Sequence, residues 1–466
     1  MAARIGITGL GTMGGALALN IAERGFDVAI HNRTPARIAA LRDGAGSLAQ
    51  RLVPAETPQA LAAALARPRA VLMMVPAGAA VDDTIAALLP HLDPGDILID
   101  GGNADFHDTD RRAAAMADAG MLYLGLGVSG GEEGARHGPS LMAGGDPRAW
   151  DAVADILTAI AARFRDDPCA ARLGPGGAGH FVKTVHNGIE YADMQLIAEI
   201  YGHLAHGEGR APAAIGQLFG DWNGGPLNAY LTEITARVLS ATDPGTGRPM
   251  VDVIEDAAGQ KGTGRWTAIE ALRLGQSASV IEAAVGARAW SADTPARAAG
   301  AATLPAPDRH EAIPRLLDAD LERALLAGRI VALSQGLSLL QAAAEERGWD
   351  LDLARTAEIW RAGCIIRSGL LDDIAAAIRA GLPQGKLILA PHFAAILGDA
   401  IGALRRTVAV MALSGQPAPA LSAALAYLDT MRHARGTANL IQAQRDYFGA
   451  HGFRRTDAPG DHHGPW

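Results

Sequence analysis

The stretch Ile5-Gly-Ile-Thr-Gly9-Leu-Gly11-Thr-Met-Gly14 decides the fold of the first part of the chain. A short apolar segment runs into a G-x-G-x-x-G turn, and a helical pattern follows at once. In this motif the first glycine makes the tight turn, the second lets a pyrophosphate approach the backbone, and the third lets the helix pack closely. The helix N-terminus then stabilises the phosphate charge. The stretch therefore predicts a dinucleotide site formed by Gly9, Leu10, Gly11, Thr12, Met13 and Gly14.

Short apolar segments and helical patterns alternate through residues 1–177. The predicted strands are Ile5–Thr8, Asp27–His31, Ala70–Val75 and Ile97–Asp100, and the predicted helices are Met13–Arg24, Pro35–Asp43 and Ala80–Leu89. This alternation is typical of a doubly wound, parallel α/β sheet of the Rossmann type. The glycine-rich segment Leu173–Gly179 marks the predicted end of this domain.

The remainder of the chain has a different character. Residues 178–435 are rich in Ala and Leu with helical periodicity, as in Leu316–Glu346 and Leu421–Ala434, which predicts a large all-α domain. Residues 436–466 are polar and rich in Gly and Pro, so we expect this tail not to fold alone.

Composition excludes several classes of protein. The chain has 466 residues and a formal net charge of -9, which argues against a nucleic-acid binder. Its two cysteines, Cys169 and Cys364, are too few for a disulfide framework or a Cys-rich zinc site, and they fit a reducing compartment. The N-terminus has no signal-peptide pattern, and no run of 18 apolar residues occurs. We therefore expect a cytoplasmic protein with no membrane span and no metal site.

Lysine is rare, because the chain has 38 arginines and only Lys183, Lys261 and Lys386 as lysines. A bias towards arginine codons explains the ratio, but it does not explain which positions kept lysine. Only lysine can lose its proton in a protein site. The three lysine positions are therefore candidates for proton transfer or for presenting a point charge to an anion such as phosphate.

The end of the second predicted strand indicates the cofactor. NAD enzymes place an acid here for the ribose 2′-hydroxyl, whereas this chain has Asn32, Arg33 and Thr34. Arg33 can pair with a 2′-phosphate, and its two neighbours can add hydrogen bonds. The alternative is a solvated surface arginine, but the missing acid favours NADP.

Four polar side chains share one face of a predicted helix at i, i+3, i+4 and i+7: Lys183, His186, Asn187 and Glu190. The alternative is a solvated face stabilised by side-chain pairs. Apolar neighbours oppose that alternative, because they bury the other side of the helix: Val182, Val185 and Ile189. The pattern indicates a cleft, in which desolvation can lower the pKa of Lys183 and make it a general base.

Three further segments bear polar or glycine-rich groups. The backbone of Ser129-Gly130-Gly131 can bind an oxyanion, and Asn103 follows a predicted strand at its carboxyl end, where ligands bind. Lys261 and Thr263 can hold a phosphate. Each alone is equally typical of an ordinary glycine turn. Lys386 and the pair His462-His463 have no assigned role.

Together, four segments give the chain a resemblance to a known family over its whole length: residues 127–142, 183–195, 260–267 and 442–451. It resembles the decarboxylating 6-phosphogluconate dehydrogenases of the oxidative pentose phosphate pathway. The resemblance implies NADP-dependent conversion of 6-phosphogluconate to ribulose 5-phosphate, CO2 and NADPH. It also implies a homodimer in which the tail reaches the partner subunit.

The resemblance also implies residue roles. Lys183 would act as general base and acid, and Glu190 would protonate C1 of the enediol. The groups that orient the sugar acid would be Asn103, Ser129, Gly130, Gly131, His186 and Asn187. The phosphate pocket would contain Tyr191, Lys261, Thr263 and Arg288, with Arg445 and His451 from the partner subunit. Val75, Pro76, Ala77 and Asn103 would also contact the cofactor.

Two alternatives remain at this point. A shorter β-hydroxyacid dehydrogenase would share the first domain and the lysine helix, but it would lack the Lys261 segment and the tail. A non-catalytic nucleotide-binding protein would share the fold, but it would not need the polar face around Lys183.

Overall fold

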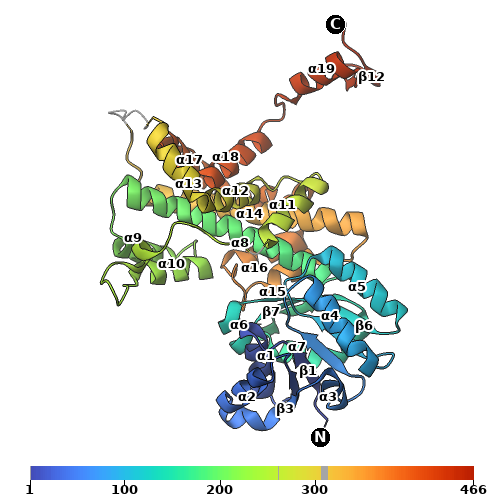
Figure 1. Cartoon of the computed structure of the whole chain (residues 1–466). Helices are drawn as coiled ribbons and strands as arrows, with labels where there is room; N and C mark the ends of the chain where they lie inside the picture. Colours follow the sequence, from blue (N-terminus) through green and yellow to red (C-terminus); the bar gives the residue numbers. More distant parts are fainter. Residues whose placement is uncertain (1, 261, 306–312) are drawn as a thin grey trace.

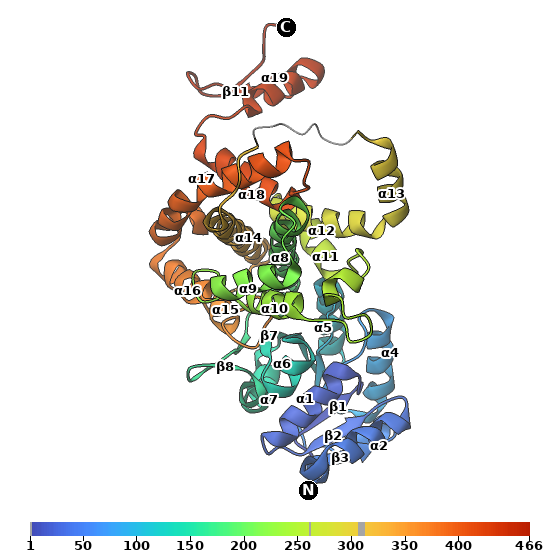
Figure 2. The ribbon, with the colours of Figure 1, turned by 90° about the vertical axis from the view of Figure 1, so that its left-hand side faces the viewer.

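The computed structural model describes residues 2–260, 262–305 and 313–466. A sheet with its helices forms one end of the molecule, a helical body packs on it, and a tail projects from the far side of that body (Figures 1 and 2).

Eight strands form the main sheet in the order β10-β7-β6-β5-β4-β1-β2-β3. Their bounds are β1 (Ile5–Thr8), β2 (Val28–His31), β3 (Leu52–Ala55), β4 (Ala70–Met73), β5 (Ile97–Asp100), β6 (Leu122–Ser129), β7 (Ser140–Gly145) and β10 (Ala170–Arg172). All neighbours are parallel except β6 and β7, which are antiparallel. Since β1 lies between β2 and β4, the strand order reverses there and opens a crevice at the carboxyl edge.

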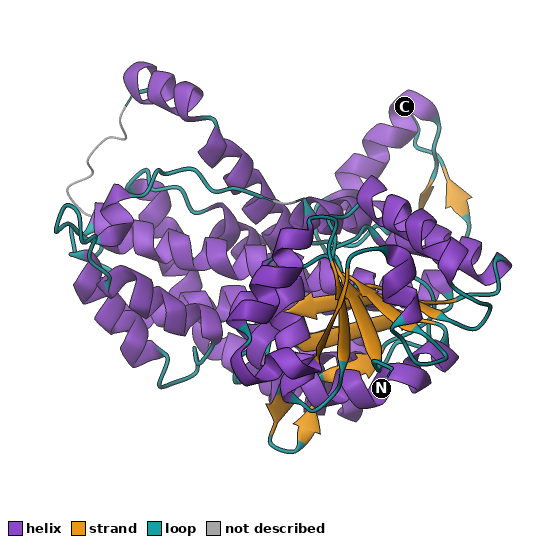
Figure 3. Cartoon of the chain, turned by 60° about the horizontal axis from the view of Figure 1, so that its bottom comes forward, coloured by secondary structure: helices purple, strands orange, loops and turns teal. Residues whose placement is uncertain are grey.

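Helices cover both faces of this sheet, as Figure 3 shows. They are α1 (Thr12–Glu23), α2 (Pro35–Gly44), α3 (Pro58–Ala63), α4 (Ala79–Leu88), α5 (Phe106–Asp118), α6 (Gly131–His137) and α7 (Pro147–Ile160). The central strands β1, β4 and β5 are buried throughout, which explains their continuous apolar sequences. The predicted α/β class is confirmed, and the predicted elements lie within two residues of the observed ones.

The helical body comprises eleven longer helices among the described residues. They are α8 (Ala178–Gly202), α9 (Pro212–Trp222), α10 (Tyr230–Ser240), α11 (Thr263–Arg273), α12 (Ser279–Ala292), α13 (Thr294–Thr303), α14 (Asp318–Arg347), α15 (Leu353–Ile359), α16 (Leu370–Ala380), α17 (Pro391–Leu413) and α18 (Pro419–Arg432). At its centre, α8 packs against α11, α12 and α14. In the described residues α14 alone is long and apolar enough to cross a bilayer, but 94% of its apolar window is buried in this body.

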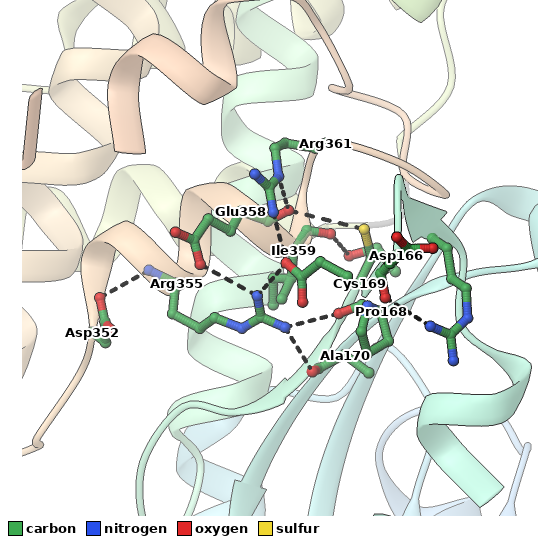
Figure 4. A network of polar contacts seen from close by, with 12 residues as sticks. Asp166, Pro168, Cys169, Ala170, Asp352, Arg355, Glu358, Ile359 and Arg361 are labelled. Atoms are coloured by element: carbon green, nitrogen blue, oxygen red, sulfur yellow. Dashed lines mark hydrogen bonds and ion pairs between the residues drawn. The ribbon is translucent and has the colours of Figure 1, made fainter. Parts of the chain in front are cut away.

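A polar network joins the sheet domain to α15 (Figure 4). Arg355 donates to the carbonyl of Pro168 at 2.8 Å and to the carboxylate of Asp167 at 2.6 Å. Arg361 donates to the same carboxylate at 2.6 Å. The hairpin of β8 (Arg163–Phe164) and β9 (Asp167–Pro168) is thereby tied to α15 and to the loop that follows it.

The tail contains α19 (Ala438–Gly449) and a small antiparallel hairpin of β11 (Phe453–Arg454) and β12 (Asp461–His462). We expected no independent folding from its composition, yet it has secondary structure of its own. Several large apolar side chains on it are exposed: Leu440, Ile441, Tyr447, Phe448 and Trp466. Such a surface on a projecting segment is typical of an interaction site.

Candidate active site

Close backbone packing sets α8 directly on the sheet. A Cβ atom at Gly144 of β7 would lie 2.4 Å from the backbone nitrogen of Gly179, in the first turn of α8. A Cβ atom at Gly127 of β6 would lie 2.5 Å from the Cβ of Lys183. Only glycine permits these approaches, and they place Lys183 at the junction of the two domains.

Lys183 is buried, with 5% of its surface exposed. Its Nζ donates a hydrogen bond to Oδ1 of Asn187 at 2.8 Å and lies 3.4 Å from Nδ1 of His186. Burial lowers the pKa of Lys183, and the nearby charge of Glu190 opposes that shift. A lysine in such a site can exchange a proton near neutral pH.

His186 links the helix to the sheet domain. Its Nε2 lies 3.2 Å from Oγ of Ser129, and its Nδ1 lies 3.1 Å from Oδ1 of Asn187. Burial, followed by the positive charge of Lys183, holds the pKa of His186 well below its ordinary value. The imidazole is therefore neutral, and it can orient its neighbours without adding charge.

Glu190 lies on the same face, with its Oε2 4.0 Å from Nδ1 of His186. Burial raises the pKa of Glu190, while the charges of Lys183 and Arg288 pull it down. Its side chain remains 23% exposed. A carboxyl group in this position can hold a proton and deliver it to a ligand.

The Ser129-Gly130-Gly131 turn closes the sheet side of the site. Gly130 has φ +123° and Gly131 has φ +63°, values that favour glycine. A Cβ atom at Gly130 would lie 2.5 Å from the carbonyl oxygen of Gly363. The turn is thus held against the loop that follows α15.

That loop contains residues the sequence analysis missed. The Trp360 ring packs edge-on against His186 with centroids 5.6 Å apart, and the Cys364 thiol donates to the Trp360 carbonyl at 3.0 Å. Burial raises the pKa of Cys364 to about 12, and Lys183 partly opposes this. Nothing in the local sequence signals this contact.

Part of the predicted phosphate pocket lies at the next turn of α8. The Arg288 guanidinium carbon stands 3.4 Å from the centre of the Tyr191 ring. A Cβ atom at Gly264 would lie 2.5 Å from that ring, so the start of α11, with the buried Thr263, packs beside it. Lys261, which we predicted here, lies outside the described residues.

The glycine-rich turn fits a dinucleotide. A Cβ atom added to Gly9 would lie 2.4 Å from the carbonyl oxygen of Met74. A Cβ atom added to Gly14 would lie 1.9 Å from the carbonyl oxygen of Gly9, so neither position accepts a side chain. At Gly11 the nearest atom would be Nη1 of Arg37, 3.9 Å away, so this glycine faces open space. A groove of about 630 Å³ lies alongside, lined in part by Leu10, Gly11, Thr12 and Arg37.

The other cofactor candidates lie around this turn. Asn32 is buried, and its Oδ1 accepts a hydrogen bond from the backbone of Leu10 at 2.9 Å. It therefore shapes the turn itself. Five of the other candidates are exposed and Val75 is half-buried; the exposed ones are Arg33, Thr34, Pro76, Ala77 and Asn103. The sequence analysis did not single out Arg37, which lies in the first turn of α2 and also lines the groove.

Arg445 and His451 do not meet these residues within one chain. Both lie on the exposed tail, which projects from the helical body away from the sheet end of α8 (Figures 1 and 2).

The chain is similar to known proteins over nearly its full length. The family model described as the NAD binding domain of 6-phosphogluconate dehydrogenase matches residues 4–174, and that of the C-terminal domain matches residues 179–466. A decarboxylating 6-phosphogluconate dehydrogenase of Escherichia coli is 46% identical, with 99% of each chain covered. An NADP(+)-dependent, decarboxylating relative of Bacillus subtilis is 44% identical, again over 99% of each chain.

Among solved structures, Plasmodium falciparum 6-phosphogluconate dehydrogenase, determined in apo form and with NADP+ or 6-phosphogluconate, is 40% identical. It matches with a TM-score of 0.95 over 99% of this chain and 100% of the other. On the matching models and these full-length relatives, the chain belongs to the 6-phosphogluconate dehydrogenase family.

Proposed function

We propose that this chain oxidises and decarboxylates 6-phosphogluconate to ribulose 5-phosphate in the oxidative pentose phosphate pathway, with NADP as cofactor. The observation that carries the proposal is the buried Lys183–Asn187 hydrogen bond, beside Glu190, at the junction of a dinucleotide domain and a helical domain. When bound at the glycine-rich turn, NADP supplies the acceptor for hydride. The protein side chains move the protons.

Lys183 is the proposed base and acid. With its pKa lowered by burial, the neutral amine takes the proton of the C3 hydroxyl as the carbinol is oxidised. The product is a β-keto acid. The resulting ammonium returns the proton to the ketone oxygen as the bond to the carboxylate breaks, which stabilises the developing enolate.

Glu190 is the proposed acid for the last proton transfer. The carboxyl group, whose pKa burial raises, protonates C1 of the enediol while the neutral amine of Lys183 takes the proton of the adjoining hydroxyl, and ribulose 5-phosphate results. Its position on the same helix face supports a division of labour, in which Lys183 serves the oxygen and Glu190 serves the carbon.

The remaining groups bind and orient. We assign the sugar acid to Asn103, Ser129, Gly130, Gly131, His186 and Asn187. We assign the phosphate to Tyr191, Lys261, Thr263 and Arg288, with Arg445 and His451 supplied by the second subunit of a homodimer. The exposed apolar side chains of the tail support this dimer, because they need a partner surface.

NADP would be held by residues 9–14, with Arg33 and Thr34 for its 2′-phosphate and with four further contacts: Val75, Pro76, Ala77 and Asn103. Asn32 holds the turn in shape. We further propose a cytoplasmic location, since both cysteines are free.

The test is to incubate purified protein with NADP and 6-phosphogluconate while following NADPH absorbance and CO2 release. We expect equal amounts of both products. Oxidation of a short β-hydroxy acid in preference to 6-phosphogluconate would favour the first alternative enzyme. NADP binding without turnover of any such substrate would favour a non-catalytic protein.

A further inference from the structure

One carboxylate organises the whole tail. Asp446 of α19 has four donors around its two oxygens. The backbone N–H of Gly452 donates to Oδ1 at 2.9 Å, and Nδ1 of His463 lies 2.6 Å from the same oxygen. The N–H of Gly464 and the indole N–H of Trp466 donate to Oδ2 at 2.8 and 3.1 Å.

These donors come from distant points of the tail. Gly452 lies in the turn after α19, whereas the other three lie beyond β12 at the end of the chain. The Asp446 side chain is 2% exposed as a result. The hydrogen bond from Gly464 is the largest of the contacts that lower the pKa of Asp446 to about 2, so the carboxylate is ionised at neutral pH.

Asp446 also determines where His451 stands. The Ala450 N–H donates to the backbone oxygen of Asp446 at 2.8 Å, and the Gly452 N–H donates to its side chain. Both neighbours of His451 have left-handed backbone, with φ +48° at Ala450 and φ +69° at Gly452. Asp446 therefore holds the turn on both sides of His451. Arg445 is the residue directly before Asp446 in α19.

We propose that Asp446 is a positioning residue that fixes Arg445 and His451 in the geometry needed to hold the substrate phosphate in the partner subunit. This inference rests on the proposed function. It also gives a role to two residues at the end of the chain: His463 and Trp466 close the tail on Asp446 rather than bind a ligand. Ionic hydrogen bonds held in place before binding cost little ordering entropy when the substrate arrives.

The chain supplies a matched control in Asp457. This carboxylate lies in the same tail and also has its pKa lowered to about 2, chiefly by its hydrogen bond with Arg455. Its side chain is 64% exposed, and Arg455 makes its side-chain contacts at 2.7 and 2.8 Å. It therefore shares charge and location with Asp446 but links no distant segments.

The experiment compares full-length Asp446→Asn and Asp457→Asn with the unchanged protein. An asparagine side chain has only one acceptor oxygen, so it cannot serve donors on both sides. For Asp446→Asn we expect the Michaelis constant for 6-phosphogluconate to rise about tenfold, with kcat within about twofold. Amide hydrogen exchange across residues 450–466 should accelerate in this variant. Asp457→Asn should leave all three quantities within about twofold.

A third variant, Arg445→Ala, tests whether the tail contributes to substrate binding at all, and so separates a failure of the inference from a failure of the proposed phosphate site. If this variant raises the Michaelis constant but Asp446→Asn does not, Asp446 has no positioning role and the phosphate site stands. If Arg445→Ala has no effect, the tail does not reach the substrate, and both proposals about it are overturned. Equal effects of the two aspartate variants would also overturn the inference, because the loss of a negative charge anywhere in the tail would then explain them.

Discussion

Each half of α8 carries a glutamate whose pKa is raised by burial, fully buried at Glu199 and partly exposed at Glu190, and the two differ in their partners. The Glu199 carboxylate accepts hydrogen bonds from the backbone N–H groups of Ala420 and Leu421 at 2.8 and 2.9 Å. It accepts a third hydrogen bond from the side-chain amide of Gln195 at 3.0 Å. Glu190 has no hydrogen-bond donor among the described residues, and within that part of the chain the charges of Lys183 and Arg288 lower its pKa.

Burial raises the pKa of both carboxyl groups, so the pKa alone does not distinguish their roles. The oxygens of Glu199 accept hydrogen bonds from the first turn of α18 and so fix the start of that helix. The oxygens of Glu190 accept no hydrogen bond from the described residues, which fits the proposed role of this group in proton transfer to a ligand. An acid whose pKa is raised by burial is a catalytic candidate when the protein supplies no hydrogen-bond donors to its carboxyl oxygens.

Replacing the base in the first half of the helix should have the largest effect. Lys183→Arg keeps the positive charge, but a guanidinium does not release its proton near neutral pH. We expect kcat to fall by about 10³-fold while NADP affinity, measured by fluorescence titration, stays within about threefold. Near-normal turnover would reject the base role of Lys183.

The direct comparison is Glu190→Gln against Glu199→Gln, since each puts an amide in place of an acid of α8 whose pKa is raised. We expect kcat to fall about 10²-fold for Glu190→Gln, because the last proton donor is lost. Glu199→Gln should keep kcat within about twofold. Equal losses in steady-state assays would show that burial, rather than the free carboxyl group, governs turnover.

Glu199 should instead determine how stability depends on pH. Its pKa is about 7 in the folded protein, raised by burial from an ordinary value of 4.5. Between these values the unfolded chain loses the proton first, so the free energy of unfolding should fall as pH rises, by about 3 kcal/mol at most. Below 4.5 and above 7 this contribution should be flat.

Urea unfolding near pH 5 and near pH 8 measures this difference. The decrease should be smaller in Glu199→Gln than in the unchanged protein. The same decrease in both proteins would assign the pH dependence to other groups.

The smallest effect should come from two glycines of α8. A Cβ atom at Gly188 would lie 2.6 Å from Cγ2 of Thr267 in α11, whereas one at Gly202 would meet nothing within 4 Å. Gly188→Ala should therefore cost about 1–3 kcal/mol of stability, and Gly202→Ala should add about 0.5–1 kcal/mol. Thermal unfolding of both variants tests this, and a stabilising Gly188→Ala would show that α11 shifts freely.

The parts that could be predicted from the sequence have short-range signatures. Strand β1 and the glycine turn follow from one decapeptide, and the polar face of α8 follows from helical spacing alone. Long-range contacts have no such pattern. Ser140, for example, donates to the carbonyl of Ile359, 219 residues away, and this contact helps bring the Trp360 loop over the site.

Asn32 shows a second limit. Its residue type and position predicted a contact with the cofactor, and in the structure its amide oxygen holds Leu10. A polar side chain near a ligand site can hold the loop in shape as well as contact the ligand, and its position in the sequence does not reveal the first of these uses. The closure of the tail on Asp446 likewise has no local signature in the sequence, since two of its four donors are backbone N–H groups and the two side-chain donors lie 17 and 20 residues away.

The glycine contacts between the sheet and α8 bear on protein engineering. Because Gly127 and Gly144 touch α8 at Lys183 and Gly179, the cofactor domain is not an exchangeable module. A domain grafted from another dehydrogenase to change cofactor choice would need glycine at both positions. Otherwise the new side chains would displace α8 and the proposed base Lys183, and we expect a transplant that binds its nucleotide well to be inactive all the same.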